Sequence, residues 1–339
     1  MASNAYLIDI FTRHQIFLER YGGGRTRAIL PILRQMAVDV NARLQAGESD
    51  YMAGRLTALL VDIENLISSA AARVERQLVL DLEELSAYEA EFARRAYQKA
   101  ATAVFVLPSS DLLASLVTKR QAKLVQGKAI KRQTLPQMVA TFDKANQKAI
   151  LQIIRNGAAT GANTQEITKQ ISKLVGSRTR QQAEALARTS TNLIASSARE
   201  EFVKRNSKFL QQEELVATLD ARVTVTCASL DGNKYPIGKG PRPPLHYGCR
   251  TIRIAVVPPE YNKPDLDGQR RAENGEQNSQ TTYGGWLKRQ PAEVQDEVLG
   301  KDRAALFRAG KVSIGDFTDK DGVPYSLTEL KRREGVTLS

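Results

Sequence analysis

Apolar side chains at helical spacing, over most of the first 200 residues, constrain the fold of this chain more than any other feature. Between residues 52 and 104 the apolar positions recur every three, four or seven residues, so they form one stripe along a helix. The members of this stripe are Leu78, Leu82, Leu85, Phe92 and Ala96. Aromatic residues make up only 6% of the chain, which also favours helices over sheets. The pattern predicts a mainly α N-terminal region, whose stripe packs on another helix of the chain or on a second subunit of an oligomer.

Breaks in the pattern predict where the helices end. We expect helices over residues 3–21, 25–46, 52–104, 135–157, 164–176 and 179–206. Gly22-Gly23-Gly24 is expected to end the first helix and act as a hinge, because glycine is unfavourable inside a helix. The last helix is rich in small residues such as Ala187, Ser190 and Ala195, which allow close packing, so we expect it at the centre of a bundle.

The chain is basic, with 49 Lys and Arg against 37 Asp and Glu, a net charge of +12. Such an excess favours non-specific contact with nucleic acid or an acidic protein surface, although a solvated basic surface has the same composition. The densest basic stretch runs from Lys119 to Arg132 and contains no aromatic residue, so stacking on single-stranded bases is not expected there. A phosphate-contacting surface and a solvated helix face both remain as interpretations.

The sequence shows no pattern typical of a membrane-spanning helix or a secretory signal. We expect no transmembrane helix, because no run of about 18 apolar residues occurs. The amphipathic N-terminal segment does not have the form of a secretory signal. With two cysteines the chain lacks a disulfide framework, so we expect it to fold in a cytosol.

The composition changes near residue 214, where β-branched residues begin to alternate. Val223, Val225 and Cys227 are expected on one face of a strand, followed by a turn at Asp231-Gly232 and a partner strand over 251–257. Residues 258–282 are expected to be a linker, and short helices and turns follow to the end of the chain. The predicted fold is therefore a mainly α N-terminal helical region followed by a small α+β module with a β-hairpin.

Both cysteines and one of the two histidines lie in this module. Cys227, His246 and Cys249 offer three ligands of the kind that zinc prefers, and Asp231 or Asp220 could supply the fourth, which would make a zinc knot. Buried unliganded thiols, a disulfide, or an incomplete site that binds nothing are the alternatives.

A catalytic interpretation pairs Cys227 as nucleophile with His246 as base, oriented by Asp220 or Asp231. No pattern of residues indicates a substrate pocket, and His14, the other histidine, has no catalytic partner in the sequence. We therefore predict no enzymatic activity, no catalytic residues and no bound organic cofactor.

Several ordered blocks of this module resemble the signature of phage head morphogenesis proteins, the minor head proteins related to the F protein of phage Mu. The blocks are Thr218-Leu219-Asp220-Ala221-Arg222-Val223, Cys227, Leu230-Asp231-Gly232, Pro243-Pro244-Leu245-His246 and Cys249-Arg250. The helix with Ala187-Arg188-Thr189 and Asn192 is similar to the helix that precedes this motif in the family, and the segment from Gly284 to Phe317 is similar to its C-terminal extension. Many relatives carry further cysteines where this chain has Thr224 and Thr251, which weakens the case for a tightly bound metal.

The resemblance implies a structural minor head protein of a tailed phage. Such a protein is associated with the portal inside the head, assembles in the host cytoplasm, and acts in procapsid assembly and in DNA packaging or ejection. Together with the helical pattern of residues 1–178, which carry no motif of the family, the resemblance divides the chain into a helical domain over 1–178, the head morphogenesis module over 179–257, and a linker with a C-terminal extension over 258–339. Asp220, Arg222, Gly232 and Arg250 would hold the module in shape, the arginines pairing with aspartates. A virion-carried effector enzyme, delivered with the DNA, is the alternative.

Overall fold

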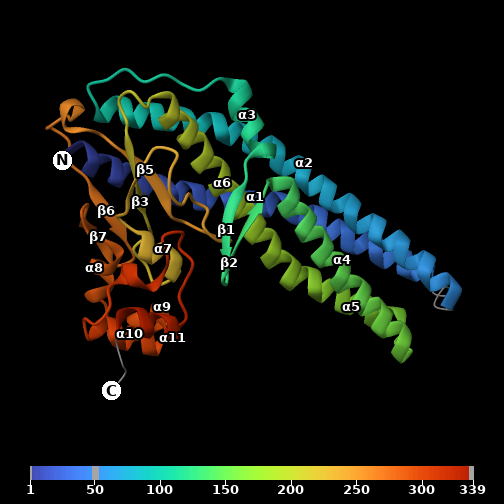
Figure 1. The fold of residues 1–339 in the computed structure, drawn as a ribbon. Coiled ribbons are helices and arrows are strands. Elements are labelled where there is room, and N and C mark those ends of the chain that lie inside the picture. Colours follow the sequence, from blue (N-terminus) through green and yellow to red (C-terminus); the bar gives the residue numbers. More distant parts are fainter. Residues whose placement is uncertain (1, 48–52, 336–339) are drawn as a thin grey trace.

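Long helices make up the N-terminal part of the molecule. The structure, a computed structural model, describes residues 2–47 and 53–335. In Figure 1, α1, α2, α4 and α5 extend together as an arm, and the small sheets and short helices gather at its other end. The elements of this part are α1 (Ala2–Ala46), α2 (Ala53–Ala100), α3 (Ser110–Lys119), β1 (Ala122–Gln126), β2 (Ala129–Gln133), α4 (Leu135–Thr160), α5 (Thr164–Leu174), the π-helical segment η2 (Val175–Thr179) and α6 (Arg180–Arg205). None of the described helices is both long enough and apolar enough to cross a membrane.

Helix α6 is the central helix of the bundle, as its small residues predicted. Every residue from Thr189 to Glu200 is buried, because α6 packs against both α1 and α2. The apolar stripe of α2 packs within the same chain: Leu78, Leu82 and Leu85 belong to one core with residues of α1, α4 and α6.

Helix α1 runs without a break through Gly22-Gly23-Gly24, so the predicted hinge is wrong. Gly22 lies where α6 passes closest, because a Cβ added there would stand 3.3 Å from Cα of Arg188. Glycine lowers helix stability by about 1 kcal/mol per residue, and packing of α1 on two long helices outweighs this loss.

Replacing Gly23 with alanine is expected to raise the free energy of unfolding by about 0.5–1 kcal/mol. A Cβ at Gly23 would meet no atom within 4 Å, so the gain in helix propensity brings no strain. Gly22→Ala is the matched control and should bring no gain, because its Cβ would press on Arg188. Urea denaturation followed by far-ultraviolet circular dichroism measures both, and an unstabilised Gly23→Ala would contradict the continuous helix.

Short elements make up the C-terminal part of the molecule. They are β3 (Gln212–Val216), α7 (Val225–Leu230), β4 (Lys234–Pro236), β5 (Ile252–Val256), the 3-10 turn η3 (Pro259–Tyr261), β6 (Gln269–Ala272), β7 (Gly275–Asn278), α8 (Tyr283–Lys288), α9 (Ala292–Leu299), α10 (Lys301–Arg308), the 3-10 turn η4 (Ile314–Phe317) and α11 (Leu327–Glu334). Strand β3 lies between β4 and β5, with Glu213 opposite Tyr235 on one side and Ala255 on the other. Two further hairpins, β1–β2 and β6–β7, are antiparallel. The predicted order, a helical region and then a small α+β module, is confirmed.

Two local predictions in this part are wrong. Residues 223–227 do not form a strand, because the side-chain oxygen of Thr224 accepts a hydrogen bond from the backbone N–H of Cys227 and starts helix α7. This cap outweighs the β propensity of the neighbouring valines. The strand expected at 251–257 is present as β5, and β3 takes the place of its predicted partner.

The segment expected to be a linker, residues 258–282, contains the β6–β7 hairpin, and β6 packs on α1. The apolar residues that follow belong to the core of the module: Trp286, Leu287 and Phe307 pack in one cluster with Cys227 and Leu230 of α7. The domain limits at 178 and 257 stay a prediction.

Candidate metal centre

Two segments bring Cys227, His246 and Cys249 together. Cys227 lies on α7, and the other two lie on the loop between β4 and β5. Hydrogen bonds fix this loop: the Leu245 carbonyl accepts from the N–H of Val125 on β1 at 2.7 Å, and the Cys249 N–H donates to the His246 carbonyl at 3.2 Å. The His-x-x-Cys segment therefore faces α7.

The distances within this cluster fit three corners of a zinc site. The two Sγ atoms lie 3.7 Å apart, and Cys227 Sγ lies 3.2 Å from His246 Nε2. All three ligand atoms are within 4.8 Å of one another. Tetrahedral zinc, with bonds of about 2.3 Å to sulfur and 2.0–2.1 Å to nitrogen, places two sulfurs about 3.8 Å apart and sulfur and nitrogen about 3.5 Å apart. The cluster can therefore hold a metal ion with three protein ligands.

Burial and neighbouring charges shift the pKa values of the three side chains in different directions. Burial raises the pKa of Cys249, but the hydrogen bond with Cys227 and the charge of His246 outweigh it and hold that pKa well below its usual value. The hydrogen bond with Cys249, together with burial, raises the pKa of Cys227 well above its usual value. Burial lowers the pKa of His246, and the charge of Cys249 more than offsets this, so that pKa is raised. These shifts favour the charged forms of Cys249 and His246 and the neutral form of Cys227. Because coordination needs thiolates and a neutral imidazole, metal binding would be linked to proton release.

Hydrogen bonds outside the cluster orient its ligands. His246 Nδ1 lies 2.9 Å from the Tyr247 carbonyl, and a hydrogen bond donated there leaves Nε2 free to coordinate. Helix α6 holds the same loop: Asn192 donates to the Cys249 carbonyl at 2.7 Å, and Thr189 accepts from the Gly248 N–H at 3.0 Å. The resemblance had marked both α6 residues, and the structure gives them a positioning role.

Thr224 and Thr251, the positions at which the resemblance suggested further cysteines, both lie beside Cys227. The hydroxyls of Thr224 and Thr251 both hydrogen-bond Cys227, and these bonds lower its pKa against the other effects. Both threonine side chains therefore lie next to the Cys227–His246–Cys249 cluster.

The structure brings together three of the four predicted ligands and places Asp231 elsewhere. Its buried carboxylate accepts hydrogen bonds from Arg270 Nη2 at 2.5 Å, from the N–H of Ala217 at 2.6 Å and from the N–H of Tyr283 at 2.6 Å. Asp231 thus joins the residue after β3 to β6 and α8. Arg270 could not be identified from local sequence because it lies 39 positions away.

The remaining motif residues form an ion pair, a surface contact and a turn within the module. Asp220 and Arg250 form a bidentate ion pair, with Arg250 Nη2 2.7 Å from Asp220 Oδ1. Burial raises the pKa of Asp220, but its hydrogen bond with Arg250 lowers it more. Arg222 is exposed and reaches Asp220 at 3.6 Å, and Gly232 takes a φ of +80° in the turn after α7, a conformation that favours glycine.

The environment of the cluster suits a structural centre better than a nucleophile. Cys227 and Cys249 are 2% and 1% exposed, so neither thiol is open to a substrate. The thiol with the lowered pKa is Cys249, whereas the catalytic interpretation had made Cys227 the nucleophile.

One comparison with known proteins gives a match. Residues 148–254 match the model of a family described as Phage Mu protein F like protein, which confirms the resemblance seen in the motifs. The matched segment begins within α4, ends within β5 and contains the whole Cys/His cluster. No curated protein and no solved structure matches the chain.

Proposed function

We propose that this chain, whose residues 148–254 match the Phage Mu protein F like family, is a structural minor protein of a tailed-phage head. In this proposal it is associated with the portal inside the head, contacts other head proteins during assembly, and affects DNA packaging or ejection. The observation that carries the proposal is the family match over the segment that contains the ordered motif and the metal-type cluster.

The surface of the molecule supports a role in protein contacts. The extended segment between α2 and α3 exposes Val104, at 75%, together with Val106 and Leu107, and Leu112 in the first turn of α3 is exposed as well. Apolar side chains gathered on one surface are typical of sites where another protein binds. This segment is a candidate contact for a second subunit or another head protein.

We further propose that the Cys227–His246–Cys249 cluster binds zinc as a structural ion. Zinc would join α7 to the loop before β5, and thiolate and imidazole ligands suit it. In this proposal the centre stabilises the module and has no catalytic role.

The alternative, a virion-carried effector enzyme, requires a catalytic unit outside the head module. The C-terminal helices α8 to α10 bury Trp286, Leu299 and Phe307 in the same core as α7, so they complete the module. This shared core favours the structural proposal.

Deletion of the gene from the phage or prophage that carries it should reduce the yield of DNA-filled heads strongly, and expression of the wild-type chain in trans should restore it. Electron microscopy and nuclease-protected DNA per particle measure this yield. An effector would leave head assembly unchanged, so normal heads from the deletion strain would contradict the structural proposal.

A further inference from the structure

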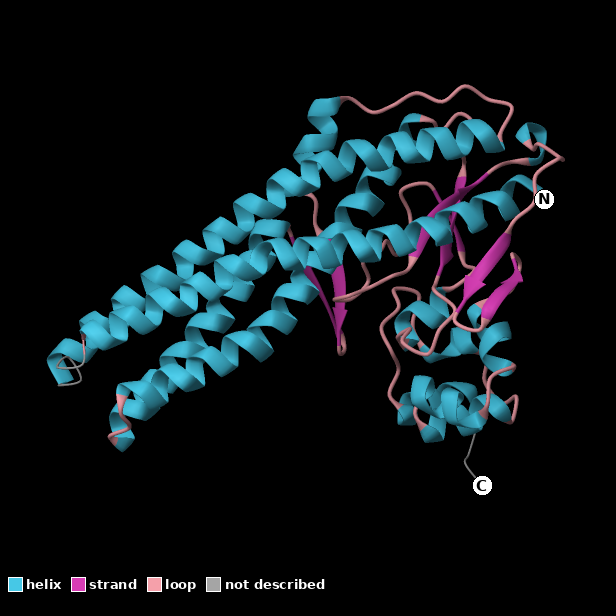
Figure 2. Ribbon diagram, turned by 180° about the vertical axis from the view of Figure 1, so that it is seen from behind, coloured by secondary structure: helices cyan, strands magenta, loops and turns pink. Residues whose placement is uncertain are grey.

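Helix α1 carries arginine at every seventh position over half of its length. Arg13, Arg20, Arg27 and Arg34 are all exposed. Seven residues are nearly two helical turns, so these side chains form one row, about 10.5 Å apart and about 31 Å long in total. Figure 2 shows α1 on the side of the arm that faces the viewer.

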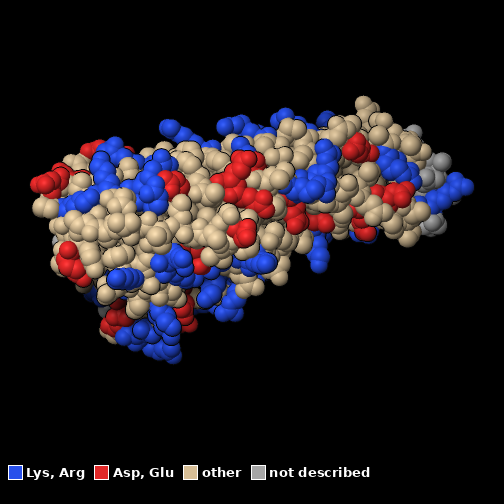
Figure 3. Space-filling view, turned by 90° about the horizontal axis from the view of Figure 1, so that it is seen from above, with Lys and Arg blue, Asp and Glu red and all other residues tan. Residues whose placement is uncertain are grey.

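Three of these arginines have no acidic partner. Arg13 pairs with Asp9 at 2.6 Å, but no ion pair joins Arg20, Arg27 or Arg34 to any carboxylate within residues 2–47 and 53–335. The view of the molecule from above in Figure 3 shows a different surface, where basic and acidic side chains are mixed over the arm. The row on α1 is thus a line of positive charge that no acidic side chain of the described residues neutralises beyond Arg13.

The residues between these arginines include several with small side chains on the exposed side of the helix. The exposed or half-exposed residues between Arg20 and Arg34 include Gly23, Gly24 and Pro31, which have little or no side chain to project. They carry no amide or carboxylate that could read base edges, and they form no apolar centre of the kind that protein interfaces have. The exposed large apolar residues of α1 lie near the two ends of the row, Ile16 and Phe17 at one end and Val38 at the other.

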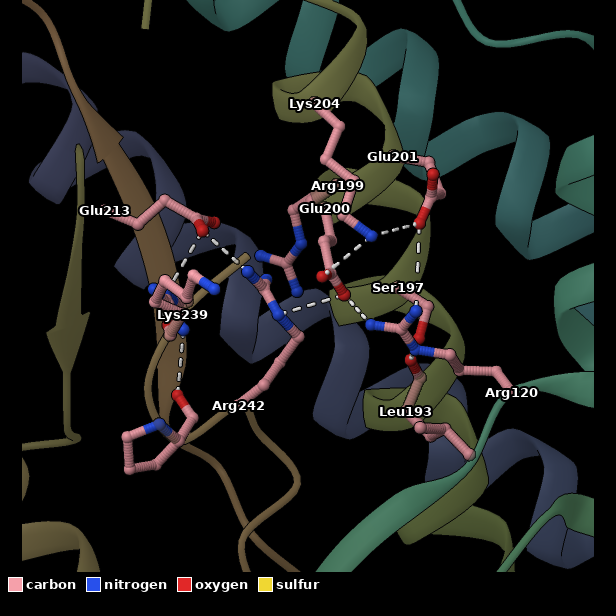
Figure 4. A network of polar contacts seen from close by, with 12 residues as sticks. Arg120, Leu193, Ser197, Arg199, Glu200, Glu201, Lys204, Glu213, Lys239 and Arg242 are labelled. Atoms are coloured by element: carbon pink, nitrogen blue, oxygen red, sulfur yellow. Dashed lines mark hydrogen bonds and ion pairs between the residues drawn. The ribbon is translucent and has the colours of Figure 1, made fainter. Parts of the chain in front are cut away.

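Some of the cations in the basic stretch from Lys119 to Arg132 are paired with acidic side chains of the same chain. Lys128 pairs with Glu329 of α11. Figure 4 shows Arg120 turned toward Glu200 of α6, with Arg242 placed between Glu200 and Glu213. Part of this stretch therefore stabilises the fold.

We propose that the arginine row of α1 binds the phosphate backbone of duplex DNA without reading its sequence. Exposed guanidinium groups without an internal partner are available to contact phosphates, and the regular spacing along a rod of about 31 Å fits a polyanion that is itself a rod. The inference rests on the proposed function, which places the protein beside packaged DNA, and it names the surface that contacts that DNA.

The test compares two variants of the full chain with equal loss of charge. Arg20→Gln/Arg27→Gln/Arg34→Gln removes the row, and Lys123→Gln/Lys131→Gln/Arg132→Gln removes three exposed cations of the β1–β2 hairpin as a matched control. Binding of each chain to a fluorescent 30-base-pair duplex of mixed sequence is measured by anisotropy at several NaCl concentrations. Each lost phosphate contact reduces the magnitude of the slope of log K against log salt concentration by about 0.9. The row variant should therefore lose about 2.7 from this magnitude, and the control variant should lose little.

Each outcome decides the proposal. An unchanged slope in the row variant, or an equal loss in both variants, would overturn it, as would a wild-type chain that does not bind the duplex at low salt. Unchanged DNA binding combined with loss of the row variant from purified heads would overturn it in favour of an acidic protein partner. The proposed function is tested separately by head yield in the deletion strain, so the two can fail independently. All substituted residues are exposed, and circular dichroism checks that the variants fold.

Discussion

Asp231→Ala is expected to lower the free energy of unfolding of the C-terminal module by about 3–5 kcal/mol, the effect of removing one partner from a buried ion pair. The substitution leaves the buried Arg270 guanidinium without its carboxylate and removes the acceptor for the N–H groups of Ala217 and Tyr283. Urea denaturation measures the effect through fluorescence of Trp286, because it is the single tryptophan of the chain and is buried in this module.

The matched control is Asp321→Asn, which changes an exposed carboxylate of the same region and should alter stability by less than about 0.5 kcal/mol. A loss below about 1 kcal/mol for Asp231→Ala would contradict the role assigned to this residue. The folded fraction of Asp231→Ala should retain the metal content of the wild type, whereas a ligand role for Asp231 predicts loss of the metal.

If the cluster binds zinc as proposed, His246→Ala is expected to abolish metal binding and make the C-terminal module sensitive to protease while the helical arm stays folded. The substitution leaves two cysteine ligands, and structural zinc contributes strongly to the stability of the segment that it joins. Elemental mass spectrometry measures the metal, and limited proteolysis with fragment mapping locates the cleavage.

His14→Gln is the control for this variant, because His14 is the other histidine of the chain and lies in the arm, where it bonds Glu89. It should keep about one zinc per chain. Equal metal content and equal protease resistance in wild type and His246→Ala would contradict the zinc proposal. A wild-type chain without metal and with two reactive thiols would do the same.

Local patterns predicted most of the helical part of the fold. The apolar stripe that contains Leu78 and Leu82 identified α2, and the small residues around Ser190 identified α6 as the central helix. The wrong predictions lie where helix packing or a helix cap outweighs the conformational preference of the local residues. The glycines at 22–24 remain helical because α1 packs on its neighbours, and Thr224 caps a helix where alternation predicted a strand.

The Cys and His residues of the candidate site could be predicted from the chemistry of their side chains, whereas the position of Asp231 could not. Cys227, His246 and Cys249 could be grouped from sequence because thiolate and imidazole ligands are rare in this chain and lie close together in it. The position of Asp231 could not be predicted, since it depends on Arg270, a partner on a hairpin that the sequence suggested was a linker. Long-range ion pairs of this kind have no local signature.

The same limit applies to the surface charge. Composition showed a basic chain, and the sequence emphasised Lys119 to Arg132 because the cations are dense there. Only the structure separates cations that pair internally, such as Lys128, from those such as Arg27 that form no ion pair with a described residue. The row on α1 became visible once the helix was known to be continuous through its glycines.

The central claim is that this protein is a structural part of the phage head, and quantitative mass spectrometry of purified heads tests it most directly. DNA-filled and empty heads are separated on a density gradient, and peptides of this chain are measured against those of the portal in each fraction. A structural head protein should occur at a fixed, low ratio to the portal in both kinds of head. Recovery of the chain solely among unassembled proteins, with none in either head fraction, would contradict it.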